Sequence, residues 1–153
     1  MDHPNGEKIV FDFPRSSQKK HLCITDYFGA DDIVAFQAVT VGNKVAELVE
    51  KWNKENKYTD AYYLHGIAVE TAEALADWVN QKIREELKLG DKCGLRYSWG
   101  YPSCPDVMQH QLVWKLLDAE KSGMALTEAG QIIPEQSTAA IVVHHPQAEY
   151  FVL

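Results

Sequence analysis

A change of hydrophobic period at Gly42 constrains the fold of this chain more than any other feature of its sequence. Before this glycine, short β-branched and aromatic runs are separated by polar stretches, which is typical of β-strands. After it, apolar residues recur at spacings of three and four, which is the period of an amphipathic helix. A further strand-like run near residue 140 completes a pattern that predicts an α+β fold.

Three short apolar runs with strand-like composition precede Gly42, at residues 8–13, 21–28 and 33–41. Because short polar loops separate them, we expect an antiparallel meander. A further strand is predicted over residues 138–145, and another over residues 147–153.

Three helices are expected after Gly42. The first begins with Asn43 as its N-cap and ends within residues 53–57. The second runs from Thr59 or Asp60 to about Leu89, with a bend or break at Gly66 and a stop at Gly90. Its expected apolar stripe consists of Leu64, Ala68, Thr71, Leu75, Trp78, Ile83 and Leu87.

The third helix is signalled by Pro105 in its first turn and ends before Gly123. Residues 124–137 show no clear period, so we expect a loop there that is functional or packed across a site. No repeat divides the 153 residues, and one domain over residues 1–153 is the expected organisation.

Composition excludes several classes of protein. The net charge is −7 and the largest basic cluster is Lys19–Lys20, so we expect no nucleic-acid partner. The longest aliphatic run, residues 139–143, is too short to span a bilayer, and the polar start shows no signal peptide. Three widely spaced cysteines are expected to be reduced thiols in a cytoplasmic protein; they are Cys23, Cys93 and Cys104.

Residues 96–105 (RYSWGYPSCP) form the most unusual segment. Two prolines fix the backbone, Gly100 permits close backbone approach, and three aromatic rings supply flat apolar walls. Arg96 adds a rigid fork of N–H donors suited to a carboxylate. Such a loop can hold a small ligand that has an aromatic part and a carboxylate. The alternative is a rigid turn into a helix, with Arg96 in a structural ion pair.

Three other groups suggest chemistry, and each has a structural alternative. Cys104 at a helix start, with His110 or His144 as base, can be a nucleophile, or it can be a buried and unreactive thiol. Adjacent His144 and His145 point to opposite faces of a strand, so no metal site is predicted. A stripe of acids on the long helix suits either acid–base work or a solvated face; it consists of Glu70, Glu73 and Asp77.

The string RYSWGYPSCPD at residues 96–106 resembles the R-x-x-x-G-Y-P-[AS]-C-P-[DE] signature of the activation domain of cobalamin-dependent methionine synthase. An ordered series of further motifs with fitting gaps extends the resemblance over roughly residues 9–153. These motifs lie at residues 12–15, 21–28, 34–42, 72–78, 123–128, 145–146 and 150–151.

The resemblance implies a single α+β domain built on a curved antiparallel sheet with helices, which binds S-adenosylmethionine. It also implies that the methyl group passes to cobalamin on a neighbouring domain. One-electron reduction by a flavodoxin-like partner, coupled to that transfer, converts inactive cob(II)alamin to methylcobalamin. The family's ligand-binding positions fall on Glu73, Arg96, Gly100, Tyr101, Tyr150 and Phe151.

Three departures qualify the resemblance. The family's N-terminal segment, with an aspartate that contacts the ligand, has no counterpart here. Val107 stands where the family often has histidine. No D-x-H-x-x-G motif is present, so cobalamin is expected on a partner domain. We therefore expect a shortened, separately encoded or excised module of a cobalamin-dependent methyltransferase system, with no catalytic residue of its own. The alternative is a docking module for a cobalamin or flavodoxin-like domain that works without ligand.

Overall fold

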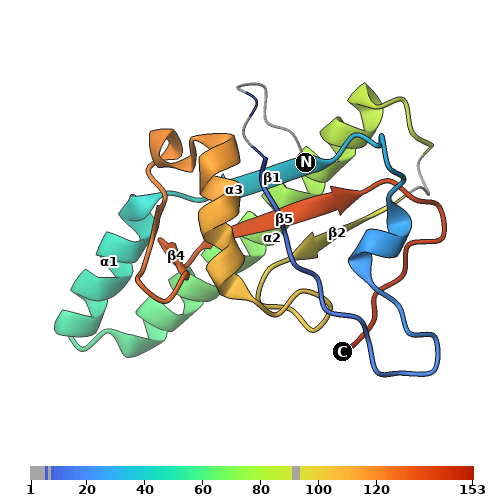
Figure 1. Ribbon diagram of the computed structural model, residues 1–153. Helices are drawn as coiled ribbons and strands as arrows, with labels where there is room; N and C mark the ends of the chain where they lie inside the picture. Colours follow the sequence, from blue (N-terminus) through green and yellow to red (C-terminus); the bar gives the residue numbers. More distant parts are fainter. Residues whose placement is uncertain (1–5, 7, 91–93) are drawn as a thin grey trace.

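The protein is described from a computed structural model, in which residues 6, 8–90 and 94–153 are placed well enough to describe. Its main sheet is antiparallel, with strand order β1–β5–β2 (Figure 1). The strands are β1 (Ala35–Thr40), β2 (Leu95–Ser98) and β5 (Ser137–Val143). A separate hairpin joins β3 (Ala125–Leu126) to β4 (Ile132–Ile133). The predicted α+β class and antiparallel sheet are therefore confirmed.

The expected meander is wrong, because the last strand of the chain lies between the other two. Ile141 of β5 is paired with Phe36 on one side and with Tyr97 on the other. Of the three runs before Gly42, only the third forms a strand. The second instead holds the 3₁₀ helix η1 (Ile24–Tyr27), where Asp26 accepts a hydrogen bond from the Cys23 amide at 3.0 Å.

Residues 9–13 and 147–153, which make up nearly all of the first and last expected strands, are irregular segments outside the strands of the sheet, and Lys8 forms a single β-bridge. Their backbone groups find individual partners instead of a ladder. Gln109, for example, bonds both the amide and the carbonyl of Asp12. Their aromatic residues then pack against the core from outside the sheet, as Phe11, Phe13 and Phe151 do. Apolar composition alone did not distinguish such covering segments from strands.

The three α-helices are α1 (Asn43–Lys54), α2 (Tyr58–Glu86) and α3 (His110–Leu117). Short 3₁₀ turns flank α3, namely η2 (Val107–Gln109) and η3 (Ala119–Ser122). Gly42, not Asn43, is the N-cap of α1, and the side-chain Nδ2 of Asn43 instead donates to the Gly123 carbonyl at 3.3 Å. This contact ties the start of α1 to the end of η3.

Helix α2 runs unbroken through Gly66, contrary to the expected bend. It ends at Glu86, three residues before the predicted end, because Lys88 adopts a left-handed conformation (φ 56°) and turns the chain ahead of Gly90. Its buried positions are all alanines: Ala61, Ala68, Ala72 and Ala76. The expected stripe was partly wrong, since Trp78 is 57% exposed.

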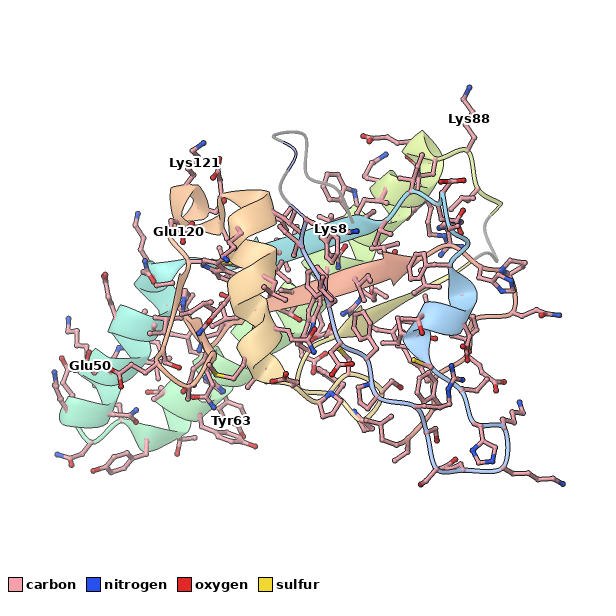
Figure 2. The ribbon with its side chains drawn as sticks, viewed as in Figure 1. Lys8, Glu50, Tyr63, Lys88, Glu120 and Lys121 are labelled. Carbon is pink, nitrogen blue, oxygen red and sulfur yellow. The ribbon has the colours of Figure 1, made fainter. Side chains whose placement is uncertain are left out.

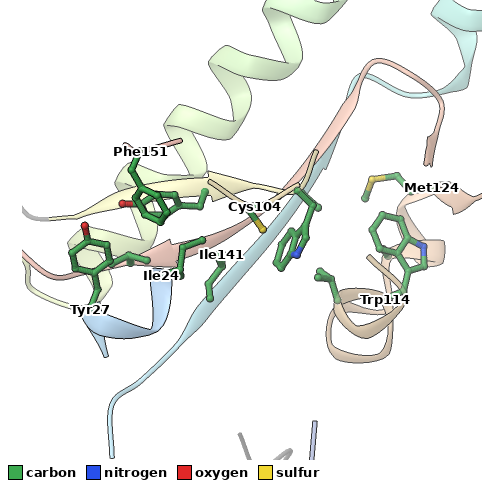
Figure 3. Close-up of a cluster of buried hydrophobic side chains, with 13 residues drawn as sticks. Ile24, Tyr27, Cys104, Trp114, Met124, Ile141 and Phe151 are labelled. Carbon is green, nitrogen blue, oxygen red and sulfur yellow. The ribbon is translucent and has the colours of Figure 1, made fainter. Parts of the chain in front are cut away.

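The two faces of the sheet are covered differently. Helix α2 lies behind it and α3 lies in front of it (Figure 1). The front face carries the aromatic core, where side chains from α3, η1 and the C-terminal segment meet (Figure 3). Among its members are Tyr97, Trp99, Val113, Trp114 and Ile141. No helix within the described ranges is long and apolar enough to cross a membrane.

Candidate functional site

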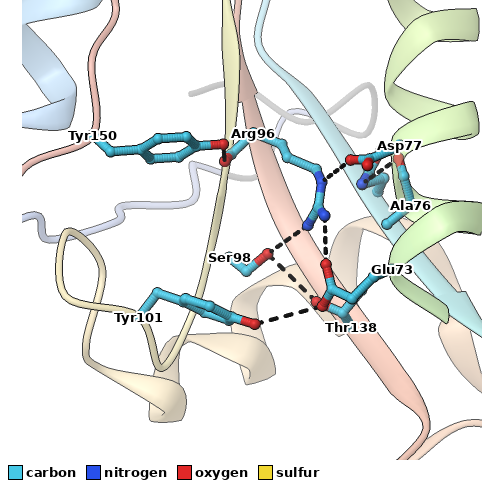
Figure 4. A network of polar contacts seen from close by, with 9 residues as sticks. Glu73, Ala76, Asp77, Arg96, Ser98, Tyr101, Thr138 and Tyr150 are labelled. Atoms are coloured by element: carbon cyan, nitrogen blue, oxygen red, sulfur yellow. Dashed lines mark hydrogen bonds and ion pairs between the residues drawn. The ribbon is translucent and has the colours of Figure 1, made fainter. Parts of the chain in front are cut away.

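Arg96 lies at the centre of a polar network between β2 and α2 (Figure 4). Its side chain projects from β2 toward the helix. Nε donates to Asp77 Oδ1 at 2.9 Å, and Nη2 donates to Glu73 Oε2 at 2.5 Å. Nη1 makes a longer contact with Ser98 Oγ, at 3.3 Å. Since residues 73 and 77 are one helical turn apart, α2 presents both carboxylates to one guanidinium.

Opposing effects act on the pKa of Arg96. Burial, the largest effect, lowers it, but the hydrogen bonds and charges of Glu73 and Asp77 together raise the pKa of Arg96 above its ordinary value. The guanidinium is therefore charged at every physiological pH and remains a fixed cation at the edge of the sheet.

The turn after β2 places Tyr101 beside the same network. Gly100 has φ 89°, which permits the turn without strain, and its amide donates to the Cys104 carbonyl at 2.8 Å. The Cys104 amide returns a 2.8 Å hydrogen bond to the Tyr101 carbonyl. Tyr101 OH then points to Glu73 Oε1 at 3.5 Å. The negative charge of Glu73 and partial burial raise the pKa of Tyr101, so the phenol stays a donor.

The C-terminal segment supplies a second aromatic wall. Tyr150 OH donates to the Arg96 carbonyl at 3.2 Å. The buried Ser103 hydroxyl holds the next residue, because it donates to the Phe151 carbonyl and accepts from the Phe151 amide at 3.1 Å. The segment 150–152 is thus fastened to the turn that carries Tyr101.

These elements surround a cavity of about 410 Å³, which is within the size range of small-molecule sites. Five of the six residues predicted to bind ligand line it, namely Glu73, Arg96, Tyr101, Tyr150 and Phe151. Gly100 shapes the turn and is not part of the lining. Their roles in binding stay predictions.

Five further residues line this cavity that are not among the six predicted ligand-binding positions: Tyr97, Ser98, Pro102, Ser103 and Val152. The first four lie in the segment 96–105, which was predicted as a whole to hold a ligand. One signal could have found Ser98, because residues two apart on a strand share a face with Arg96. Ser103 carried no such signal, since its role depends on the docked C-terminal segment.

A second cavity of about 490 Å³ shares the wall formed by Glu73 and Tyr101. Residues 131–133 line it, together with Thr127 of the β3–β4 turn and His110. The stretch 124–137, expected as a loop across a site, is therefore a hairpin beside this second cavity. None of its residues lines the first cavity.

The nucleophile hypothesis for Cys104 finds no support. Its side chain is 2% exposed, and burial raises the pKa of the thiol to about 12. A thiol with that pKa is protonated at neutral pH and is a poor nucleophile. The structure favours the alternative of a buried, unreactive cysteine.

The two adjacent histidines have different contacts, and only part of the acidic stripe reaches Arg96. His144 contacts Asp32 at 3.5 Å, whereas the ring of His145 packs against Tyr27. No group of three or more potential metal ligands occurs among the described residues. Of the acidic stripe, Glu73 and Asp77 reach Arg96, whereas Glu70 is exposed and lines neither of the two cavities.

The fold and this site together define a small α+β domain in which one arginine, one glutamate and several aromatic rings line a ligand-sized cavity. The chain belongs to the family of vitamin B12 dependent methionine synthase activation domains, whose model matches residues 11–153.

Two methionine synthases are among its curated relatives. That of Mycobacterium tuberculosis is 37% identical over 169 aligned residues, covering 92% of this chain and 14% of the relative. That of Mycobacterium leprae is 36% identical over 177, covering 97% of this chain and 15% of the relative. The chain thus spans about one-seventh of the length of these relatives.

A solved structure has the same fold. It is described as the MetH reactivation domain bound to AdoHcy, and it aligns with a TM-score of 0.78 at 24% identity. The alignment covers 96% of this chain and 49% of the other. At that identity the match shows the shared fold.

Proposed function

We propose that this chain binds S-adenosylmethionine and supports the reductive methylation of inactive cob(II)alamin to methylcobalamin in a methionine synthase. One observation carries the proposal: residues from α2, β2, the turn at 99–104 and the C-terminal segment converge on one cavity around Arg96. Membership of the activation-domain family supports it. So does the solved relative of the same fold, which is described as bound to AdoHcy.

Each side-chain type at the cavity suits one part of the ligand. Among the described residues, Nη1 of Arg96 contacts only Ser98, at 3.3 Å, which leaves donor capacity for the methionyl carboxylate. Glu73 can meet the ammonium or the sulfonium, and Tyr101 and Tyr150 can cover the adenine or ribose. Because a sulfonium is already a good leaving group, the chain needs no acid or base, and its task is positioning.

Cobalamin itself belongs to a partner domain in this proposal. The sequence has no D-x-H-x-x-G motif, and the described residues include no cluster of potential metal ligands. When bound to the partner, cobalamin supplies the cobalt that accepts the methyl group, and a flavodoxin-like reductant supplies the electron. The cytoplasmic location expected from composition stays a prediction.

Calorimetric titration of S-adenosylmethionine into the chain tests binding. We expect saturable binding with one site, and a loss of at least tenfold in affinity for Arg96→Ala. Arg84→Ala is the control, because Arg84 is a partly buried arginine of α2 that does not line the cavity. The proposal fails if the native chain shows no saturable heat, or if Arg96→Ala binds as the native chain does.

An exposed apolar surface on α2 favours a second candidate function. The start of α2 exposes Tyr58, Tyr62, Tyr63 and Ile67, each by more than 60% (Figure 2 shows Tyr63). An exposed apolar face of this kind marks an interaction surface. The alternative is therefore a docking module for a cobalamin or flavodoxin-like domain. Association with an isolated cobalamin domain that is equal with and without S-adenosylmethionine supports docking alone.

A further inference from the structure

The charges around the candidate site do not balance. Two carboxylates, Glu73 and Asp77, contact the single positive charge of Arg96 (Figure 4). Among the residues that line the cavity, Arg96 is the only Lys or Arg, and Glu73 is the only acid. The charges of Arg96 and Glu73 cancel, and Asp77 therefore leaves the site with a net charge of one negative unit. The Arg96 side chain is 14% exposed, so these charges interact in a medium less screened than bulk water.

We propose that Asp77, acting through Arg96, makes the cavity prefer ligands with a net positive charge, so that it selects the sulfonium of S-adenosylmethionine over the neutral thioether S-adenosylhomocysteine. This inference rests on the proposed function. The two ligands carry the same carboxylate, ammonium, ribose and adenine. They differ by one methyl group and by the positive charge on sulfur.

The charge difference coincides with the proposed reaction. Methyl transfer breaks the S–CH₃ bond and leaves both of its electrons on sulfur, while the methyl group joins the reduced cobalt of the partner's corrin. The ligand's net charge therefore falls from +1 to 0. A cavity with an excess negative charge holds the reactant more tightly than the product, which favours release of the spent ligand.

Asp77 is better suited to this role than Glu73. Glu73 lines the cavity and contacts Tyr101, so a change there alters the wall as well as the charge. The Asp77 side chain is 73% exposed and contacts Nε, outside the cavity lining. Asp77 is thus a positioning residue whose charge can be removed while the wall is left intact.

The test compares the affinity ratio of the two ligands, measured by calorimetry, for four proteins. The native chain should bind S-adenosylmethionine more tightly, and Asp77→Asn should reduce that ratio at least about threefold, the size expected for one charge several ångströms away even with the screening of bulk water. Asp77→Glu, which keeps the charge, should restore the ratio. Glu70→Gln removes a charge about two turns before Asp77 on α2, outside the cavity, and should leave the ratio unchanged.

The outcomes separate this inference from the proposed function. If the native chain binds neither ligand, the proposed function fails and the inference falls with it. If the native chain binds both and Asp77→Asn keeps the native ratio, the proposed function stands and the inference is overturned. A variant that weakens both ligands by one factor also overturns it, because that result is a structural effect. Circular dichroism of each variant confirms that it is folded.

Discussion

The two faces of the sheet differ in the size of the side chains that cover them. The face toward α3 is packed with large rings, including those of Tyr97 and Trp99, and holds the main hydrophobic core. The face toward α2 is covered by alanines, such as Ala72 and Ala76, which bring the helix close to the strands. The charged cluster of Glu73, Asp77 and Arg96 lies on the second face. One face supplies stability, and the other gives an acid-bearing helix close access to Arg96.

Gln37 illustrates how tightly the helix-facing side is organised. It is 3% exposed, and its Nε2 donates to the Ala76 carbonyl of α2 at 3.1 Å. A strand side chain thus holds the helix backbone directly between the positions of Glu73 and Asp77. The candidate site is stable because the helix that carries its acids is fixed by small side chains and one buried amide.

The largest effect is expected on the aromatic face. Ile141→Ala removes three carbons from a side chain that is 2% exposed, and the cavity left behind should lower the free energy of unfolding by about 3 kcal/mol. Urea denaturation measures this change. Val10→Ala, at a side chain 72% exposed, is the control and should cost less than about 0.5 kcal/mol. Equal costs for the two variants would contradict the assignment of the core to this face.

A smaller loss is expected when the helix face is overpacked. Ala76→Leu adds three carbons where the exposed fraction is 0%, so it should push α2 off the sheet and cost about 1–3 kcal/mol. Because the acids move with α2, ligand affinity should also fall. Ala74→Leu, on the exposed side of the same helix, should change neither quantity. Normal binding by Ala76→Leu would show that close helix packing is not needed for the site.

Ser103→Ala tests the attachment of the C-terminal segment to the turn that carries Tyr101. The Ser103 hydroxyl is 5% exposed and bonds both the amide and the carbonyl of Phe151, so its loss leaves buried backbone groups without this partner. We expect a cost of about 1–2 kcal/mol in the free energy of unfolding. Ser17→Ala, at an exposed position, is the matched control. Protease cleavage within residues 149–153 should become faster in Ser103→Ala only.

The smallest effect is a pH dependence of the aromatic face. His110 packs between the rings of Trp99 and Trp114, and burial lowers its pKa below the ordinary value of 6.5, although the Gly130 carbonyl and Asp106 partly oppose this. The unfolded chain then binds a proton at higher pH than the folded chain does. The contribution of His110 is therefore fully present above pH 6.5 and decreases as pH falls below it.

His110→Gln removes this titration. Its unfolding free energy should fall less than that of the native chain between pH 7.5 and pH 5.5, as measured by urea denaturation at each pH. A steeper fall in the variant would mean that the histidine is stabilised in its charged form.

Much of the molecule could be predicted from sequence, and the failures in the arrangement of the strands share one physical cause. The helices and the strand at residues 35–40 followed from local periodicity. The central position of β5 did not, because it depends on pairing between residues about 100 positions apart. Residues 147–153 have strand-like composition, yet their bonds to Ser103 and Tyr97 place them outside the sheet. Local composition does not encode such distant partners.

Some residues of the candidate site could likewise be predicted from local sequence, and others could not. Arg96 and the turn that follows it stood out by composition, whereas Glu73 could not be separated from Glu70 by periodicity. Only the direction in which α2 packs distinguishes these two acids. The alternative considered for Arg96, a structural ion pair, is also present in the structure. The ion pair and a ligand contact are compatible, because they use different nitrogens of one guanidinium.

The central position of β5 also bears on how the chain emerges during synthesis. Among the described residues, β1 and β2 both pair with residues 137–143 in the main sheet, so neither strand has this partner until β5 has left the ribosome. Proteins dominated by such long-range pairings fold slowly, because the chain entropy of closing the loop precedes the contacts that reward it. The backbone of β1 therefore waits for its strand partner through about 100 residues of synthesis, and this interval is the period in which a chaperone would contribute most.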